Sequence, residues 1–117
     1  MMFLGFNQLI WYYQHPIDFR KQVDGLVLLI ADKLEKDPVS GQLFIFRNRQ
    51  SNKLKLLWWD HHGFWLLYRR IEKGRFKLPA IVDQLIEISA DQLSVLLAGI
   101  DFKKQDYFEK VTASKFY

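Results

Sequence analysis

The sequence contains no cysteine, and its six glycines are dispersed. Without cysteine the chain can form neither a disulfide nor a thiolate metal site, and without clustered glycines it has no glycine-rich phosphate loop. No uncharged apolar run reaches the roughly 18 residues that a transmembrane helix needs. The N-terminus has neither a basic leader nor a small-residue cleavage site. The sequence therefore predicts a cytoplasmic protein with no membrane partner.

What is present is typical of one folded domain. The chain has 117 residues, of which 50% are hydrophobic, 26% charged and 16% aromatic. That length supports one core but not two, and the composition is too apolar for a disordered chain. We expect a single domain over residues 1–117, in which residues 103–117, charged with scattered aromatics, form a loosely ordered tail.

The positive charge is distributed unevenly along the chain. Nine of the 17 lysine and arginine residues lie between Arg47 and Lys77, where the only acids are Asp60 and Glu72. This stretch therefore carries a net +7 in a chain whose total is +4, and the remainder is net negative. Such an asymmetry indicates a positive surface that is suited to a polyanion.

Short strands separated by polar or glycine-containing turns make up most of the chain. The expected strands are residues 8–14, 43–48, 53–59, 64–71 and 75–78. Lys53 and Lys55 alternate with leucines, which predicts a sheet with one packed face and one solvent-exposed basic face. Trp58 and Trp59 break this alternation, so one of them should lie on the outer face unless a bulge intervenes.

A helix is expected after the first strand. Asp18 is an N-cap candidate, and the apolar residues over residues 19–36 recur at three- and four-residue steps. A helix of this kind would place one apolar stripe on the packed face of the sheet.

The C-terminal part is also expected to be helical. Residues 80–88 form either a short helix or, at residues 86–88, an extended segment. Ser89 and Gln92 fit a capping box, and Gly99 is suited to the C-cap. The resulting fold class is α+β: an antiparallel sheet of about four to five strands, one long helix packed on it, and a C-terminal helical segment.

No residue pattern indicates catalysis or a metal site. His61 and His62 are adjacent in a turn, so their side chains should project in different directions, and no third ligand stands at metal-site spacing. The 13 carboxylates show no grouping of the kind that a two-metal nuclease needs. We therefore predict no catalytic residue, no metal, no cofactor and no small-molecule substrate. A small nuclease is the least favoured of three function classes; the other two are a DNA-binding protein and a protein-interaction module.

Cationic and aromatic side chains that alternate along strands can neutralise phosphates and stack on bases. The candidate nucleic-acid contacts are Arg47, Arg49, Lys53, Lys55, Arg69, Arg70 and Arg75. The alternative interpretation is a protein partner, for which the candidate contacts are Trp58 and Trp65.

Several linked motifs resemble one known family. They are DFRK followed by DGL at residues 18–26, DPVSGQLFIFRNR at 37–49, WDHHGFWL at 59–66, YRRIEKGRF at 68–76 and LLAGID at 96–101. The chain is similar in these motifs to the TnpB or Orf2-like accessory proteins of bacterial insertion sequences of the IS 66 type. The departures are small: Phe19 replaces the usual Met, and Arg69 replaces the usual Lys.

This resemblance implies a non-catalytic accessory role in transposition, beside a separate DDE transposase. We expect DNA, either transposon ends or target, and the transposase of the same element as partners. The interpretation favoured here is DNA binding through the basic strands. The alternative is a protein-interaction module that recruits or orders the transposase without contacting DNA.

Overall fold

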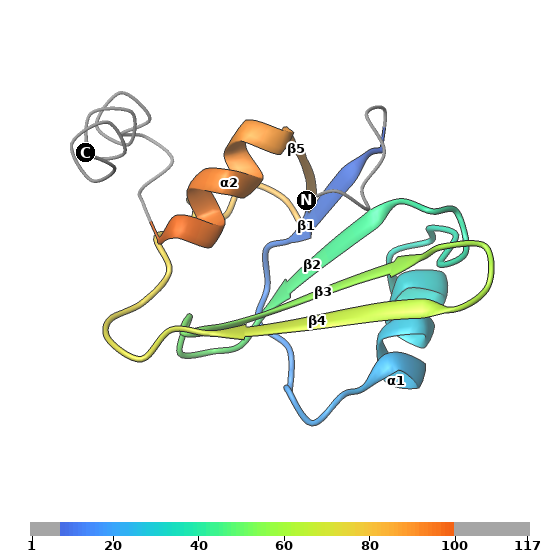
Figure 1. Cartoon of the computed structure of the whole chain (residues 1–117), viewed down its shortest axis with the longest axis horizontal. Helices are drawn as coiled ribbons and strands as arrows, with labels where there is room; N and C mark the ends of the chain where they lie inside the picture. The colour runs from blue at the N-terminus through green and yellow to red at the C-terminus, as the bar shows by residue number, and fades with distance from the viewer. Residues whose placement is uncertain (1–7, 100–117) are drawn as a thin grey trace.

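The computed structural model describes residues 8–99, which form a sheet with a helical segment on each side (Figure 1). The elements in chain order are β1 (Ile10–Tyr13), α1 (Val23–Leu28), η1 (Leu29–Lys33), β2 (Leu43–Arg47), β3 (Lys53–Trp59), β4 (Phe64–Arg70), β5 (Leu85–Ile88) and α2 (Ala90–Ala98). The α+β class is confirmed, but the helices are short.

The strands form one mixed sheet in the order β4-β3-β2-β1-β5. β2, β3 and β4 are antiparallel neighbours, as the short turns between them require. β1 and β2 are parallel, so the expectation of an antiparallel sheet is wrong for this pair. The helical crossover between them returns the chain to the end of the sheet at which β1 begins, so β2 runs in the same direction as β1. β5 pairs antiparallel with β1 on its other side.

Both faces of the sheet are covered, which corrects the expectation of one solvent-exposed face. Leu56 of β3 packs in a hydrophobic cluster with Leu93 of α2. The next residue, Leu57, points to the opposite face and packs with Leu26 of α1. Strand residues on both faces are therefore buried, as in a sheet between two layers.

The tryptophan pair of β3 follows from this two-sided burial. β3 pairs with β4 residue by residue as far as Trp59, so no bulge interrupts it. Trp58 is only 3% exposed, and Trp59 is half-buried. As predicted for an unbroken strand, one tryptophan, Trp59, lies on the same face as Lys53 and Lys55. That face is packed around Leu57, so Trp59 is half-buried rather than fully exposed.

The first helix begins at Val23 rather than at residue 19. Asp18 does not cap it, because its carboxylate accepts hydrogen bonds from the backbone nitrogen and the Nε of Arg20, both at 2.9 Å, in an exposed turn. Gln22 takes the N-cap position without a side-chain capping bond. The local Asx-type turn thus delays the helix.

The expected apolar stripe of this helix is confirmed. Leu26, Ile30 and Leu34 are buried in one cluster against the sheet. α1 continues directly into the π-helical segment η1, where the amide of Leu34 donates to the carbonyl of Leu29.

Residues 75–88 differ most from the sequence prediction. Residues 75–78 form no strand, and residues 80–88 form no helix. The predicted alternative, an extended segment at residues 86–88, is confirmed, since β5 occupies Leu85–Ile88. The buried side chain of Gln14 binds this segment: its Nε2 donates to the carbonyl of Ala80 (3.0 Å). Its Oε1 accepts from the amides of Val82 (3.0 Å) and Asp83 (3.1 Å). A long-range contact therefore holds the chain extended here.

α2 has the caps that the sequence predicted. The hydroxyl of Ser89 accepts from the amide of Gln92, and the Gln92 side chain accepts from the amide of Ser89, which completes a capping box. Gly99 ends the helix in the left-handed conformation, at φ 78°.

Substituting Ser89→Ala is expected to lower the free energy of unfolding by about 1 kcal/mol. The amide of Gln92 loses its acceptor, and the Gln92 side chain that accepts from the amide of residue 89 is held less firmly. Urea unfolding followed by tryptophan fluorescence measures the change. Ser94→Ala is the matched control, since the Ser94 hydroxyl only donates to the carbonyl of Ala90 within the helix. Equal stability of the two variants would contradict the capping role.

Within residues 8–99 no helix is long and apolar enough to cross a membrane. The predicted tail, residues 103–117, and the last two residues of the motif at 96–101 lie outside the described residues.

Candidate nucleic-acid interface

Cationic side chains gather at one end of the sheet, where the β2–β3 turn meets the end of β4. We call this group the basic end; it comprises Arg49, Lys53, Arg69, Arg70, Lys73 and Arg75. Two backbone hydrogen bonds assemble it, from the amide of Ile71 to the carbonyl of Asn52 (3.0 Å) and from the amide of Phe76 to the carbonyl of Ser51 (2.7 Å). They bring the segment after β4 against the turn, at the left of Figure 1.

Among residues 8–99 few acids compensate the charge of the basic end. Residues 49–53 and 69–75, which supply these cations, contain one acidic residue, Glu72, and its carboxylate pairs with Arg70 at 2.8 Å. Arg70 is the one member of the group in an ion pair among the described residues. The side chains of Arg49, Arg69 and Arg75 are exposed, and Lys53 is half-buried. The resulting surface has excess positive charge in contact with water.

Lys55 does not belong to this surface, which corrects its assignment as a phosphate contact. It is 3% exposed. Its Nζ donates to the main-chain carbonyls of Phe19 (2.9 Å) and Lys21 (2.6 Å). Burial lowers the pKa of this ammonium, and the nearby Asp18 opposes that change. Lys55 thus anchors the turn before α1 to the centre of β3.

Arg47 is also engaged by the protein. Its Nε (3.1 Å) and NH2 group (2.9 Å) both donate to the carbonyl of Gln14, across the β1–β2 pair. It lies near the buried Tyr12, whose pKa is raised to about 12 by burial although Arg47 opposes the shift. Arg47 therefore ties β2 to the end of β1, and its donors are committed to that contact.

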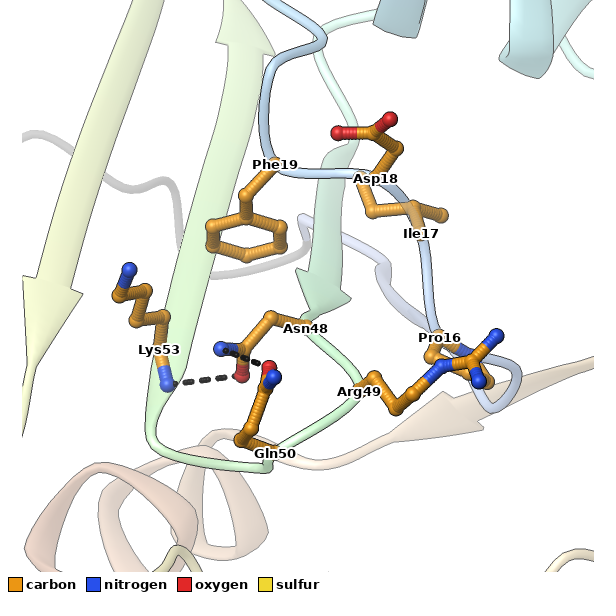
Figure 2. Close-up of a pocket in the computed structure, with 8 residues that line it drawn as sticks. All are labelled: Pro16, Ile17, Asp18, Phe19, Asn48, Arg49, Gln50 and Lys53. Carbon is orange, nitrogen blue, oxygen red and sulfur yellow. Dashed lines mark hydrogen bonds between the residues drawn. The ribbon is translucent and has the colours of Figure 1, made fainter.

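A cleft opens beside the basic end, between the turn before α1 and the β2–β3 turn. Its volume is about 390 Å³. The lining residues are Pro16, Ile17, Asp18, Phe19, Asn48, Arg49, Gln50 and Lys53. Figure 2 shows the ring of Phe19 extending toward Asn48, with Lys53 beside the ring and Arg49 across the cleft, next to Pro16. The cleft thus combines an aromatic wall with two cationic groups.

The floor of the cleft is held by Asn48. Its Oδ1 accepts from the amides of Asn52 and Lys53, both at 3.1 Å. Its Nδ2 donates to Asn52 Oδ1 (2.7 Å) and Gln50 Oε1 (3.2 Å) (Figure 2). Because Asn48 is buried and all of these bonds fall within one turn, the β2–β3 turn is fixed in shape.

Phe19 is held from the opposite side. Lys55 Nζ lies 4.9 Å from the centre of its ring. The ring of Tyr68 meets it edge-on, with centroids 6.3 Å apart. The aromatic wall of the cleft is therefore positioned by β3 and β4, and Phe19 is one of the residues that line the cleft.

The two candidate partner-binding tryptophans stack on each other across β3 and β4. Their ring centroids are 5.9 Å apart and the planes are 13° from parallel. Trp58 is buried, whereas Trp65 is 49% exposed. Trp65 also donates from Nε1 to Asp60 Oδ2 at 2.7 Å. Of the pair, Trp65 is the one that presents surface to solvent.

The two histidines lie in the exposed β3–β4 turn. His61 adopts a left-handed backbone conformation, at φ 83°. Asp60 organises the turn, since its Oδ1 accepts from the amides of His62 and Gly63, both at 2.9 Å. These bonds and the one from Trp65 lower the pKa of Asp60. Within residues 8–99 no group of three or more His, Cys, Asp and Glu side chains is placed to hold a metal ion.

Two features of this region were missed by sequence reasoning. Lys73 was counted in the basic stretch of the sequence but not among the candidate contacts, and it belongs to the basic end. Phe19 was assigned to the helix because it continues the apolar spacing of α1. The signal that could have separated it is Asp18, whose carboxylate favours a local turn as much as a helix cap.

Comparisons with known proteins identify related chains. The profile of the family described as "IS66 Orf2 like protein" matches residues 8–107. A protein of Sinorhizobium fredii (strain NBRC 101917 / NGR234), "Uncharacterized protein y4jC", is 35% identical over 89 residues, which cover 76% of each chain. "Uncharacterized protein y4hO" of the same strain is 37% identical over 99 residues, covering 85% of this chain and 86% of the relative. No solved structure matches the chain significantly.

Proposed function

The chain belongs to the IS66 Orf2-like family, and from this premise we propose that it is a non-catalytic accessory protein of transposition that binds DNA through the basic end. Membership of the family associates the chain with the transposition machinery of insertion sequences, and the family is not a known catalytic one. The DNA-binding role is the finer step, and it rests on the surface charge.

One observation carries the proposal: several exposed cations share one end of the sheet, and the two carboxylates near them within residues 8–99, Glu72 and Asp18, are each paired with another arginine, Arg70 and Arg20. Arg49, Arg69 and Arg75 have no ion-pair partner among the described residues. Lysine and arginine side chains in this state can displace the counterions condensed on DNA, which supplies affinity without sequence specificity. Arg47 and Lys55 are omitted from the proposed contact set because their donors bind main-chain carbonyls.

Replacing Arg69 and Arg75 together by glutamine is expected to weaken duplex binding for every sequence tested. Because each phosphate contact contributes about 0.9 to the slope of log affinity against log salt, the slope should flatten by about 2. Fluorescence anisotropy with a labelled duplex over a range of salt concentrations measures both quantities.

The matched control removes the same charge from another part of the molecule. Lys33 and Lys36 lie on and just after η1, where their Nζ atoms approach the rings of Tyr13 (5.7 Å) and Trp11 (3.9 Å). Their joint replacement by glutamine should leave the salt slope unchanged. Equal slopes for the two double variants would locate the DNA contacts away from the basic end.

A second candidate function is supported by the exposed indole of Trp65. A large aromatic side chain that is 49% exposed on β4 is suited to anchor a protein partner. In this alternative the chain recruits or orders the transposase of its element in the cytoplasm without touching DNA. Copurification of the transposase from a nuclease-treated extract, abolished by Trp65→Ala and retained by the Arg69→Gln/Arg75→Gln variant, would support this alternative over the first.

A further inference from the structure

We infer that the cleft beside the basic end receives an unpaired base of single-stranded DNA, stacked on Phe19, with the flanking phosphates bound by Arg49 and Lys53. This inference rests on the proposed function and names the form of DNA that the site prefers. The juxtaposition that carries it is an aromatic ring and two cationic side chains that line one recess of the surface (Figure 2).

The cleft is of a suitable size and is built before any ligand arrives. Its volume of about 390 Å³ falls within the range of roughly 300–1,000 Å³ that small-molecule sites occupy. Asn48 fixes the floor through bonds to the turn, and Lys55 fixes the wall through the carbonyl of Phe19. A base would therefore enter a site whose geometry is already set, which lowers the entropic cost of binding.

The Phe19 ring is suited to stacking. The ammonium of Lys55 lies 4.9 Å from its centre, and the ring of Tyr68 is close to perpendicular to it, with centroids 6.3 Å apart. The surface that lines the cleft can accept the face of a base, because stacking is tolerant of base identity. Gln50 adds an amide group to the cleft lining for the polar edge of the base.

The charges around the cleft favour an anionic backbone. In Figure 2 Lys53 lies beside the ring, and Arg49 lies across the cleft, next to Pro16. The one carboxylate in the lining belongs to Asp18, and it is paired with Arg20. In Figure 2 that carboxylate points away from Arg49 and Lys53. Phosphates on both sides of a bound base would thus meet cations rather than an unpaired acid.

A base within a duplex cannot use this site. Both of its faces are covered by neighbouring base pairs, so stacking on Phe19 would require its extrusion, which costs a few kcal/mol. A base in a single strand is already available for stacking on an aromatic side chain. The basic end alone binds either form through phosphates, whereas the cleft adds affinity for the single strand.

The test compares a labelled single-stranded oligonucleotide with its blunt duplex by anisotropy, for the wild type and for Phe19→Leu. Because stacking of one base on an aromatic side chain is worth about 1–3 kcal/mol, Phe19→Leu should weaken single-strand binding by about fivefold or more. Duplex binding should not change. Trp59→Leu, which removes a half-buried aromatic side chain from the end of β3 that is remote from the basic end, is the matched control and should change neither affinity.

Gln50→Glu provides a second variant that does not disturb the core. The new carboxylate can still accept from Asn48 Nδ2, but it places a negative charge in the cleft, so the ratio of single-strand to duplex affinity should fall. A 5-iodouracil-substituted single strand should also photocrosslink to Phe19, as located by peptide mass spectrometry.

The outcomes separate the two proposals. If the wild type binds both DNA forms and neither Phe19→Leu nor Gln50→Glu alters the ratio of affinities, the base site is refuted while the DNA-binding function stands. If the wild type binds neither form, the proposed function fails and the inference fails with it.

Discussion

Lys55→Met is expected to lower the free energy of unfolding by about 2–4 kcal/mol, because two main-chain carbonyls lose a charged donor. Lys55 is 3% exposed, and its Nζ donates to the carbonyls of Phe19 and Lys21. Methionine keeps the length and the apolar stem of lysine but cannot donate. Removing a buried ammonium also removes its desolvation cost, which reduces the net loss below the sum of two charged hydrogen bonds.

The measurement is urea unfolding followed by tryptophan fluorescence, with Lys53→Met as the matched control. Lys53 lies two positions earlier on the same face of β3 and is half-buried, and its side chain makes no hydrogen bond within residues 8–99. Its replacement should change stability by at most about 0.5 kcal/mol. If Lys55→Met proved as stable as Lys53→Met, the buried lysine would have no anchoring role.

Gln14→Leu is the second substitution with a large expected effect. The Gln14 side chain is 1% exposed and makes three hydrogen bonds to the backbone of residues 80–83. Leucine fills a similar volume but leaves two amides and one carbonyl without their partner. We expect the free energy of unfolding to fall by about 2–4 kcal/mol, since each unsatisfied buried group costs about 1–3 kcal/mol and some will rebind water.

Hydrogen exchange distinguishes this loss from a general destabilisation. The amides of Val82 and Asp83 should exchange faster in Gln14→Leu, together with the β5 amides that pair with β1. Gln22→Leu is the control: Gln22 is exposed, and its side chain makes no capping bond. Unchanged protection of residues 82 and 83 would show that Gln14 does not hold this segment.

The sheet was predictable where local signals determine it. Residues 53–59 were predicted as a strand and form β3, because alternating leucines lie between turns whose residues favour reversal. The β3–β4 turn was also predictable from local sequence, because the Asp60 side chain accepts hydrogen bonds from the amides of His62 and Gly63. The parallel pairing of β1 with β2 was not predictable in this way, because it depends on the path of the crossover.

The misplaced side chains have a common physical cause. The alternation of Lys53 and Lys55 with leucines shows that lysines and leucines lie on opposite faces of the strand. It does not show which face is exposed to solvent. Lys55 can point to a covered face because two main-chain carbonyls accept hydrogen bonds from its ammonium. These carbonyls belong to Phe19 and Lys21, which are distant in sequence, so the residues around Lys55 do not indicate them. Arg47 is similar, since its acceptor is the carbonyl of Gln14 on another strand. Charge density along the sequence therefore located the basic region but not the residues that remain exposed in it.

The salt dependence of DNA affinity tests the central claim, that exposed cations at one end of the sheet form a phosphate-binding surface. The decisive comparison is the wild type against a variant with glutamine at Arg49, Lys53, Arg69 and Arg75, on one duplex over a range of salt concentrations. The account predicts measurable wild-type binding and a slope of log affinity against log salt that is flatter by about 3–4 in the variant. Identical slopes, or no wild-type binding at low salt, would contradict it.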